Sequence, residues 1–194
     1  MTASRTIPAS DRPDAKRNEE DRLVAGFAAL AIAIHILEAS FPSPLPGVKP
    51  GLANVVTLVV FLRHGFAIAA WVSGMRVMVG SLLIGTFMSP TFALSASGAV
   101  SALILMGVAG RLGGRHIGPI GLSVLAAIAH MSTQIIVAYL LFIPNPALFK
   151  LAPILLTAAL VFGTVSGVIA GIVLDRLPQR AVRPGVNDGG GTVS

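Results

Sequence analysis

KPGLANVVTLVVFLRHGFAIAAWVSGMRVMVGSLLIGTFMSP, residues 49–90, contains two apolar runs separated by a short basic turn at Arg63 and His64. The second run carries one arginine, Arg76, deep among apolar neighbours. A charged side chain at the centre of a membrane helix costs about 2.5–3.5 kcal/mol or more, so it faces protein, water or a ligand. This stretch therefore predicts two membrane helices, with Arg76 directed towards the inside of a larger bundle.

The rest of the chain has the composition of a membrane domain. Of its 194 residues, 54% are hydrophobic and 11% are charged, and the mean hydropathy is +0.84. Average proteins carry about 25% charged residues. We expect one membrane domain at 23–174, because that length accommodates about six spans. Polar segments at 1–22 and 175–194 are expected to be disordered cytoplasmic tails.

Charge and motif content exclude several functions. The chain has 14 Lys and Arg residues against 8 Asp and Glu residues. Such a balance can indicate nucleic-acid binding. Here the basic residues are scattered between apolar runs, so we expect that the protein does not bind nucleic acid. There is no cysteine, which excludes thiolate metal sites. The GxxxxGK[ST] phosphate loop is also missing, so any ATP must be used by partner proteins.

Several short motifs carry a family resemblance: GLAN at 51–54, the basic-glycine turn at 63–65, R-x-x-x-G-S at 76–81 and G-T-F-x-S-P at 85–90. Together they resemble the Gx transporter family, also labelled heptaprenyl diphosphate synthase component I. That family is similar to the substrate-binding S-components of energy-coupling-factor (ECF) transporters. The resemblance covers about residues 25–175.

The resemblance implies an all-α, six-helix integral membrane bundle of the S-component type. It also implies a non-enzymatic subunit that captures a small anionic or vitamin-like solute outside the cell and moves it inward. The implied partners are a transmembrane coupling subunit, two ATPase subunits and membrane lipid, with no cofactor in the chain itself. The expected location is the bacterial cytoplasmic (inner) membrane.

Apolar runs predict six spans, at 23–39, 52–62, 66–83, 91–109, 120–142 and 151–174. The second span is about 16 Å long at 1.5 Å per residue, too short to cross roughly 30 Å of hydrocarbon. It therefore starts deeper than the others, or its entry lines a wet cavity. The proline-rich segment 40–50, which includes Lys49, is expected to cover that cavity.

Two spans carry small residues at helical spacing. Gly163, Gly167 and Gly171 form a double GxxxG motif in the sixth span, which predicts a helix contact. In the first span, Ala25, Ala29 and Ala33 share one face. That face either packs inside the domain or docks onto another protein. The resemblance implies docking, because S-components contact the coupling subunit through an AxxxA motif in their first helix.

The positive-inside rule fixes the expected orientation, since cytoplasmic segments carry the excess of Lys and Arg. With six spans, eleven such residues fall on the side of both termini and two, Lys49 and Lys150, on the other. Both termini are therefore expected to be cytoplasmic. Six polar residues then lie at mid-membrane or in the outer half and predict an outward-facing substrate site: His35, Glu38, Asn54, Arg76, His130 and Gln134.

Each of these residues has more than one interpretation. Arg76 could bind a solute or pair with Glu38, and Asn54 could bind a solute or cap its helix. His130 and Gln134, one turn apart, could contact a solute or hold helices together through hydrogen bonds. His35, Glu38 and His130 could also ligate a divalent metal, although nothing in their spacing specifies a metal site.

Two alternative functions follow from these interpretations: a membrane subunit of polyprenyl diphosphate (isoprenoid) synthesis, and a divalent-metal uptake subunit. Prenyl diphosphate synthases bind magnesium through aspartate-rich motifs. The sequence contains one acidic cluster, at 19–21 in the polar tail. We therefore expect no enzymatic activity from this chain.

Overall fold

The computed structural model describes residues 13–40, 52–113 and 117–177. These residues form six α-helices and a short 3-10 helix: α1 (Pro13–Ser40), α2 (Leu52–His64), α3 (Phe66–Ile84), α4 (Pro90–Gly113), α5 (Pro119–Leu141), η3 (Pro146–Leu151) and α6 (Ala152–Arg176). The predicted all-α membrane fold with six helices is confirmed. Four segments are long and apolar enough to cross a membrane, which makes the protein multi-pass: Phe66–Ile84, Pro90–Leu112, Pro119–Leu141 and Pro146–Arg176.

The N-terminal helix is longer than the sequence suggested. α1 begins at Pro13, so residues 13–22, which the sequence analysis assigned to the N-terminal tail, are helical. Proline is well tolerated in the first turn, where its missing N–H has no partner in any case. The Ala, Lys, Arg and Glu residues that follow are strong helix formers.

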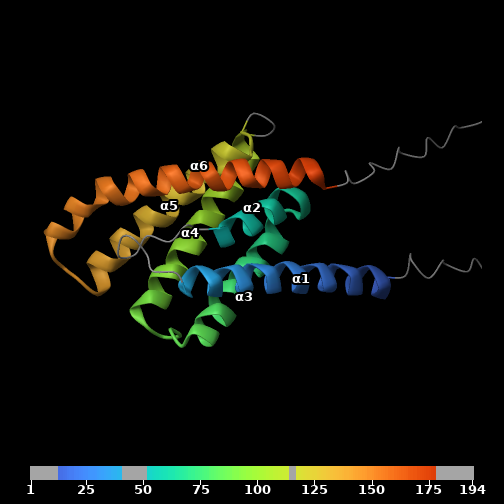
Figure 1. Cartoon of the computed structure of the whole chain (residues 1–194), viewed down its shortest axis with the longest axis horizontal. Coiled ribbons are helices and arrows are strands. Elements are labelled where there is room, and N and C mark those ends of the chain that lie inside the picture. The colour runs from blue at the N-terminus through green and yellow to red at the C-terminus, as the bar shows by residue number, and fades with distance from the viewer. Residues whose placement is uncertain (1–12, 41–51, 114–116, 178–194) are drawn as a thin grey trace, which may run out of the picture.

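The helices pack as a ring in the order α1, α3, α4, α5, α6 and α2, and the contact between α2 and α1 closes it. α2 also contacts α3 and α5. In Figure 1, α1 and α6 run along the long axis in opposite directions. The start of α1 and the end of α6 therefore lie at the same end of the molecule.

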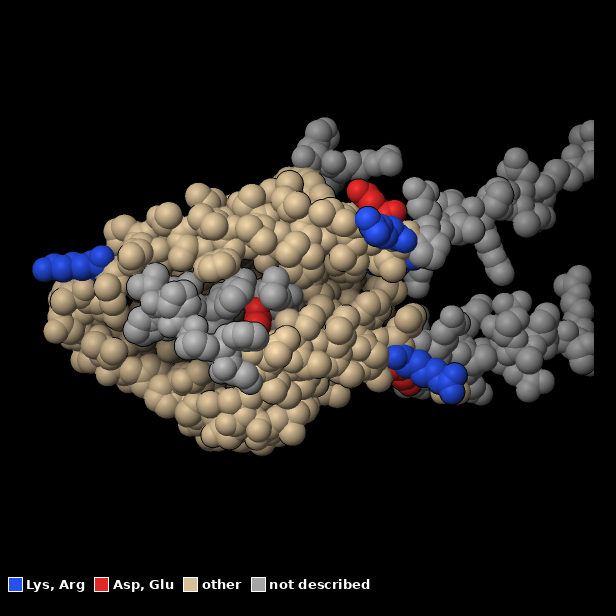
Figure 2. Space-filling model, in the orientation of Figure 1, with Lys and Arg blue, Asp and Glu red and all other residues tan. Residues whose placement is uncertain are grey.

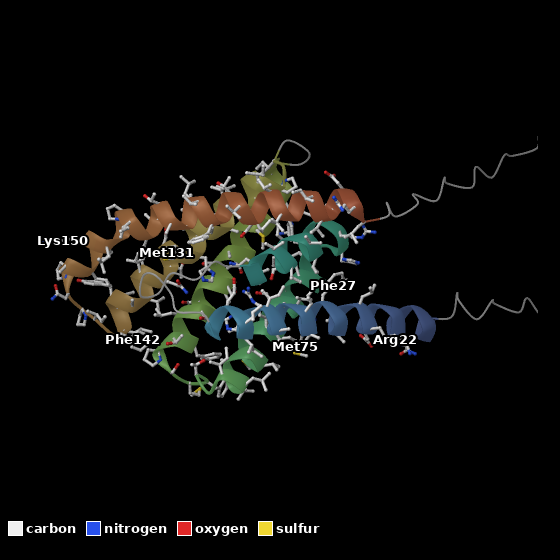
Figure 3. The ribbon with its side chains drawn as sticks, viewed as in Figure 1. Arg22, Phe27, Met75, Met131, Phe142 and Lys150 are labelled. Atoms are coloured by element: carbon white, nitrogen blue, oxygen red, sulfur yellow. The ribbon has the colours of Figure 1, made fainter. Side chains whose placement is uncertain are left out.

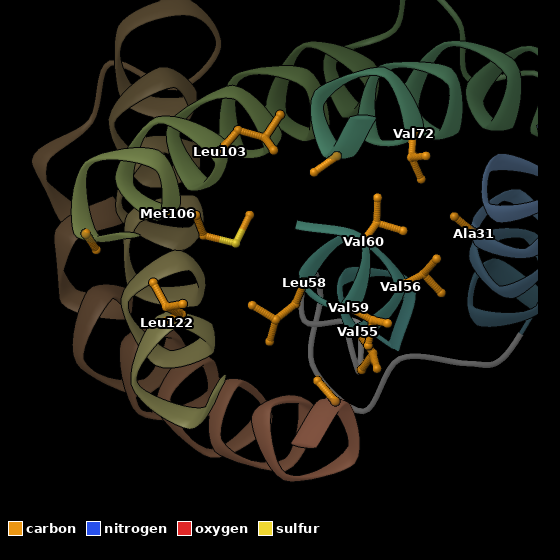
Figure 4. Packing of buried hydrophobic residues seen from close by; sticks show 13 residues of the cluster. Ala31, Val55, Val56, Leu58, Val59, Val60, Val72, Leu103, Met106 and Leu122 are labelled. Atoms are coloured by element: carbon orange, nitrogen blue, oxygen red, sulfur yellow. The ribbon is translucent and has the colours of Figure 1, made fainter. Parts of the chain in front are cut away.

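α2 is the short, central helix of the bundle. Its 13 residues span about 20 Å, less than the hydrocarbon core of a membrane. Six consecutive residues are buried, so every face of the helix is covered: Val55, Val56, Thr57, Leu58, Val59 and Val60. Figure 4 shows Val60 facing Val72 of α3 and Val56 facing Ala31 of α1, with Leu103, Met106 and Leu122 across from Leu58.

Glycines permit the closest helix approaches. A Cβ at Gly167 of α6 would lie 2.6 Å from the Cα of Ile120 in α5, and one at Gly163 would lie 2.9 Å from the Cβ of Ala127. These two glycines form the predicted helix contact. Gly171 has no atom within 4 Å of its Cβ position and takes no part in it. At the α2–α3 turn, Gly65 has φ of +90°, which side-chain-bearing residues rarely adopt.

Gly107 and Gly110 of α4 face the aromatic side chains of Phe66 and Phe61, so the end of α4 adjoins the α2–α3 turn.

Basic residues lie towards the ends of the bundle. Figure 3 shows Arg22 and Lys150 at opposite ends of the long axis. On the face in Figure 2, Lys and Arg lie at these two ends and the surface between them is largely uncharged.

Candidate functional site

A cavity of about 270 Å³ lies inside the helix ring and is lined by residues from all six helices. The lining includes all six residues predicted from the sequence as a substrate site: His35, Glu38, Asn54, Arg76, His130 and Gln134. The structure therefore brings together side chains from α1, α2, α3 and α5. Their role in binding a solute stays a prediction.

Arg76 is the best-positioned polar group in this cavity. Its side chain is only 6% exposed, and Nη1 donates a 2.7 Å hydrogen bond to Oδ1 of Asn54. Glu38, 7% exposed, also lines the cavity and attracts the guanidinium electrostatically. Asn54 thus has a role that we did not consider from the sequence, because it orients the arginine through a charge-assisted bond.

Three polar atoms in the cavity lining are buried without a hydrogen-bond partner in the described chain: Thr57 Oγ1, Arg76 Nε and His130 Nδ1. Buried polar groups are nearly always hydrogen-bonded, so each exception requires an explanation. The residues that carry these atoms come from α2, α3 and α5, and all three line the cavity.

Thr57 is the site residue that sequence reasoning missed. It stands in the apolar run VVTLVV, which indicates packing rather than binding. One signal was available, because Thr57 lies three residues after Asn54 and therefore on the same face of a helix. The structure places both side chains on the cavity.

His130 is held against α4 by a glycine. A Cβ at Gly98 would lie 2.8 Å from Nε2 and from two carbon atoms of the imidazole, so only glycine leaves space for it. Its Nδ1 is buried and has no hydrogen-bond partner among the described residues, Gln134 included.

The metal interpretation gains no support from the geometry. Within residues 13–40, 52–113 and 117–177, no group of three or more His, Cys, Asp or Glu side chains could hold a metal ion. His35 instead packs closely on Gly80 of α3, whose Cβ position lies 2.8 Å from the imidazole Cδ2. His35, Glu38 and His130 share the cavity without forming such a group.

The structure describes the predicted docking face but not the predicted lid. Ala25, Ala29 and Ala33 are all exposed, so this face of α1 does not pack inside the chain. The proline-rich segment expected to cover the cavity, with Lys49, lies outside the described residues. The buried face of α1 is formed instead by Ala28 and Ala31.

Comparison with known proteins gives one result. A family model described as heptaprenyl diphosphate synthase component I matches residues 27–173, most of the chain. No curated protein and no solved structure matches it. The match spans α1 from Phe27 to nearly the end of α6, so it includes every helix that lines the cavity.

Proposed function

Because the chain belongs to the heptaprenyl diphosphate synthase component I family, we propose that it is the substrate-binding subunit of an ECF-type transporter. In this role it captures a small solute outside the cell and releases it inside. The proposal places the protein in the bacterial cytoplasmic membrane with both termini cytoplasmic.

The cavity is the observation that carries this proposal. It lies within a multi-pass bundle, where a buried arginine is costly without a functional partner. Arg76 lines the cavity and is oriented by Asn54, and its buried Nε has no hydrogen-bond partner in the described chain. A solute-binding site needs this combination of a concave space and a few oriented polar groups.

The proposal assigns energy coupling to partner proteins, because the chain has no phosphate loop and exposes a face of small residues on α1. The chain has no phosphate loop, so ATP hydrolysis is assigned to partner ATPases. The exposed Ala25, Ala29 and Ala33 face of α1 is assigned to the transmembrane coupling subunit. Small residues allow the close helix approach that membrane interfaces use.

Co-purification tests the proposal. The full chain is purified from bacterial membranes, denatured, and searched by mass spectrometry for released small molecules. Ala126→Phe fills the cavity from α5, whereas Val165→Phe introduces the same side chain at an exposed position of α6. We expect the wild type and Val165→Phe to release the same compound, and Ala126→Phe to release at least about tenfold less. Equal release from both variants, with normal melting temperatures, would refute solute binding in this cavity.

The family description also favours a second candidate, a component of polyprenyl diphosphate synthesis. Two observations count against it. Glu38 is the only acidic residue in 23–174, so the membrane domain contains no aspartate-rich magnesium motif of the kind that prenyl diphosphate synthases use. A cavity of about 270 Å³ does not enclose a long prenyl chain. We expect the purified chain to leave the rate and product length of a soluble prenyltransferase unchanged. An altered product length would favour the synthase role.

A further inference from the structure

We propose that Ser123 of α5 and Ser166 of α6 form a second hydrogen-bonding subsite in the cavity, which takes an uncharged hydroxyl or carbonyl group of the solute. The proposal rests on the function proposed above, since it assumes that the cavity holds a solute. It adds a contact that the sequence did not predict, at the end of the cavity away from His130 and Gln134.

The two serines, called the serine pair below, lie at one end of the cavity. Both line it, and both are almost fully buried, with 7% of Ser123 and 4% of Ser166 exposed. On α5, Ser123 precedes His130 by about 10 Å along the helix axis. Ala126 and Ala127 line the cavity between these two levels. The serine pair is therefore separated from His130 by an apolar wall.

The close contact between α5 and α6 brings the serine pair together. A Cβ added at Gly167 would lie 3.1 Å from the Cβ of Ser123, and Ser166 is the residue before Gly167. The two helices pack against each other more extensively than any other pair in the described chain. Polar groups on packed helices are held more precisely than groups on loops.

The hydroxyl groups of the serine pair differ from those on the outer surface of α6. Thr157 and Thr164 are exposed, and each donates a hydrogen bond to a carbonyl of its own helix. A bond of this kind satisfies a hydroxyl inside a helix. The hydroxyls of Ser123 and Ser166 form no hydrogen bond within the described chain. They are therefore free to bind a group in the cavity.

These two hydroxyls are also accessible. Neither oxygen belongs to the fully buried polar atoms without a partner, which in the cavity lining are those of Thr57, Arg76 and His130. Because Ser123 and Ser166 are buried residues that line the cavity, the surface that their oxygens keep faces the cavity. A hydroxyl can donate one hydrogen bond and accept two. The pair can therefore bind a hydroxyl or a carbonyl.

The surroundings of the serine pair favour an uncharged group. The charged described residues that line the cavity are Glu38 of α1 and Arg76 of α3. Neither α1 nor α3 contacts α5 or α6 in the described chain. An ionised group that is buried without a charged partner is costly. The walls also include Leu103 and Met106 of α4, so the solute inferred carries an apolar part beside its neutral polar group.

Benzyl alcohol and ethylbenzene test this subsite, because the two molecules have nearly the same shape and only the alcohol carries a hydroxyl. Binding to the detergent-solubilised full chain is measured by saturation-transfer NMR in the millimolar range. All proteins are compared at one detergent concentration, so partition of the probes into micelles is the same throughout. The wild type should bind both probes, and Ala126→Phe, which fills the cavity, should bind neither.

Two double variants isolate the hydroxyls. Ser123→Ala with Ser166→Ala removes the serine pair, and Thr157→Val with Thr164→Val removes two exposed hydroxyls as the matched control. We expect the serine double variant to bind benzyl alcohol about tenfold more weakly than the wild type, the effect of losing neutral hydrogen bonds. Its affinity for ethylbenzene should be unchanged. The threonine double variant should bind both probes normally.

The outcomes separate this inference from the proposed function. Unchanged binding of benzyl alcohol in the serine double variant overturns the subsite. An equal loss for both probes also overturns it, because a merely structural role of the serines would weaken both alike. So does a wild type that binds benzyl alcohol no better than Ala126→Phe. In each case, release of a co-purified compound that depends on Ala126 would still uphold the proposed function. A selective loss of benzyl alcohol binding supports the subsite.

Discussion

Replacing Gly167 with alanine should destabilise the bundle, whereas the same substitution one turn later, at Gly171, should not. An added Cβ at Gly167 would lie 2.6 Å from the Cα of Ile120 and 3.1 Å from the Cβ of Ser123. The Ile120 atom belongs to the backbone and cannot rotate away, so α5 and α6 would have to separate. The Cβ position of Gly171 has open space around it.

The pair of variants isolates the cost of this contact. Each replaces glycine by alanine inside α6, which favours the helix by about 0.8–1.0 kcal/mol, so the term cancels in the comparison. Overpacking a close contact costs about 1–3 kcal/mol. We therefore expect Gly167→Ala to be about 1–3 kcal/mol less stable than Gly171→Ala.

Equilibrium unfolding in mixed micelles with increasing denaturing detergent measures the difference. The wild type, Gly167→Ala and Gly171→Ala are compared at the same micelle composition. Ser123 and Ser166, beside this contact, line the cavity, so Gly167→Ala should also weaken solute binding. If Gly167→Ala were as stable as Gly171→Ala, the close α5–α6 approach would be wrong.

Three further predictions concern the site, the docking face and the orientation. Arg76→Lys should weaken solute binding by about 1.5–3 kcal/mol, because an ammonium cannot replace the guanidinium fork. Normal affinity with a much lower melting temperature would instead assign Arg76 a purely structural role. Ala29→Leu should abolish co-purification of the coupling subunit while solute binding persists. An intact complex would contradict docking at this face. A cysteine that replaces Ala147 should react with an impermeant reagent outside intact cells, and one that replaces Leu112 should react only after permeabilisation. The reverse pattern would contradict the proposed orientation.

The sequence predicted the fold well because the deciding forces are local. A run of apolar residues must form a helix in lipid, since its backbone groups have no other partners there. The same reasoning identified α2 as unusually short and Arg76 as buried inside the bundle, both of which the structure shows. The extension of α1 to Pro13 was not predicted. The polar composition of 13–22 indicated a tail, although many of its residues have high helix propensity.

The details of the site could not be predicted, because they depend on which helix faces meet. The contact between His130 and Gly98 joins α5 to α4, and neither residue marks the other in the sequence. Asn54 had two plausible local roles, yet it bonds to Arg76 of the next helix. Thr57 looked like one more residue of an apolar run. Each role became visible only when the helices were placed around one cavity.

The short α2 turns one face to the cavity and its other faces to the apolar core. Asn54, Thr57 and Leu58 share a helix face and line the cavity, whereas the valines at 55, 56, 59 and 60 belong to the core. Among the described residues α2 does not contact α4, although both helices line the cavity, so the cavity lies between them. In the proposed transport cycle, any movement of α2 would change its packing against α1, α3, α5 and α6, the four helices that it contacts.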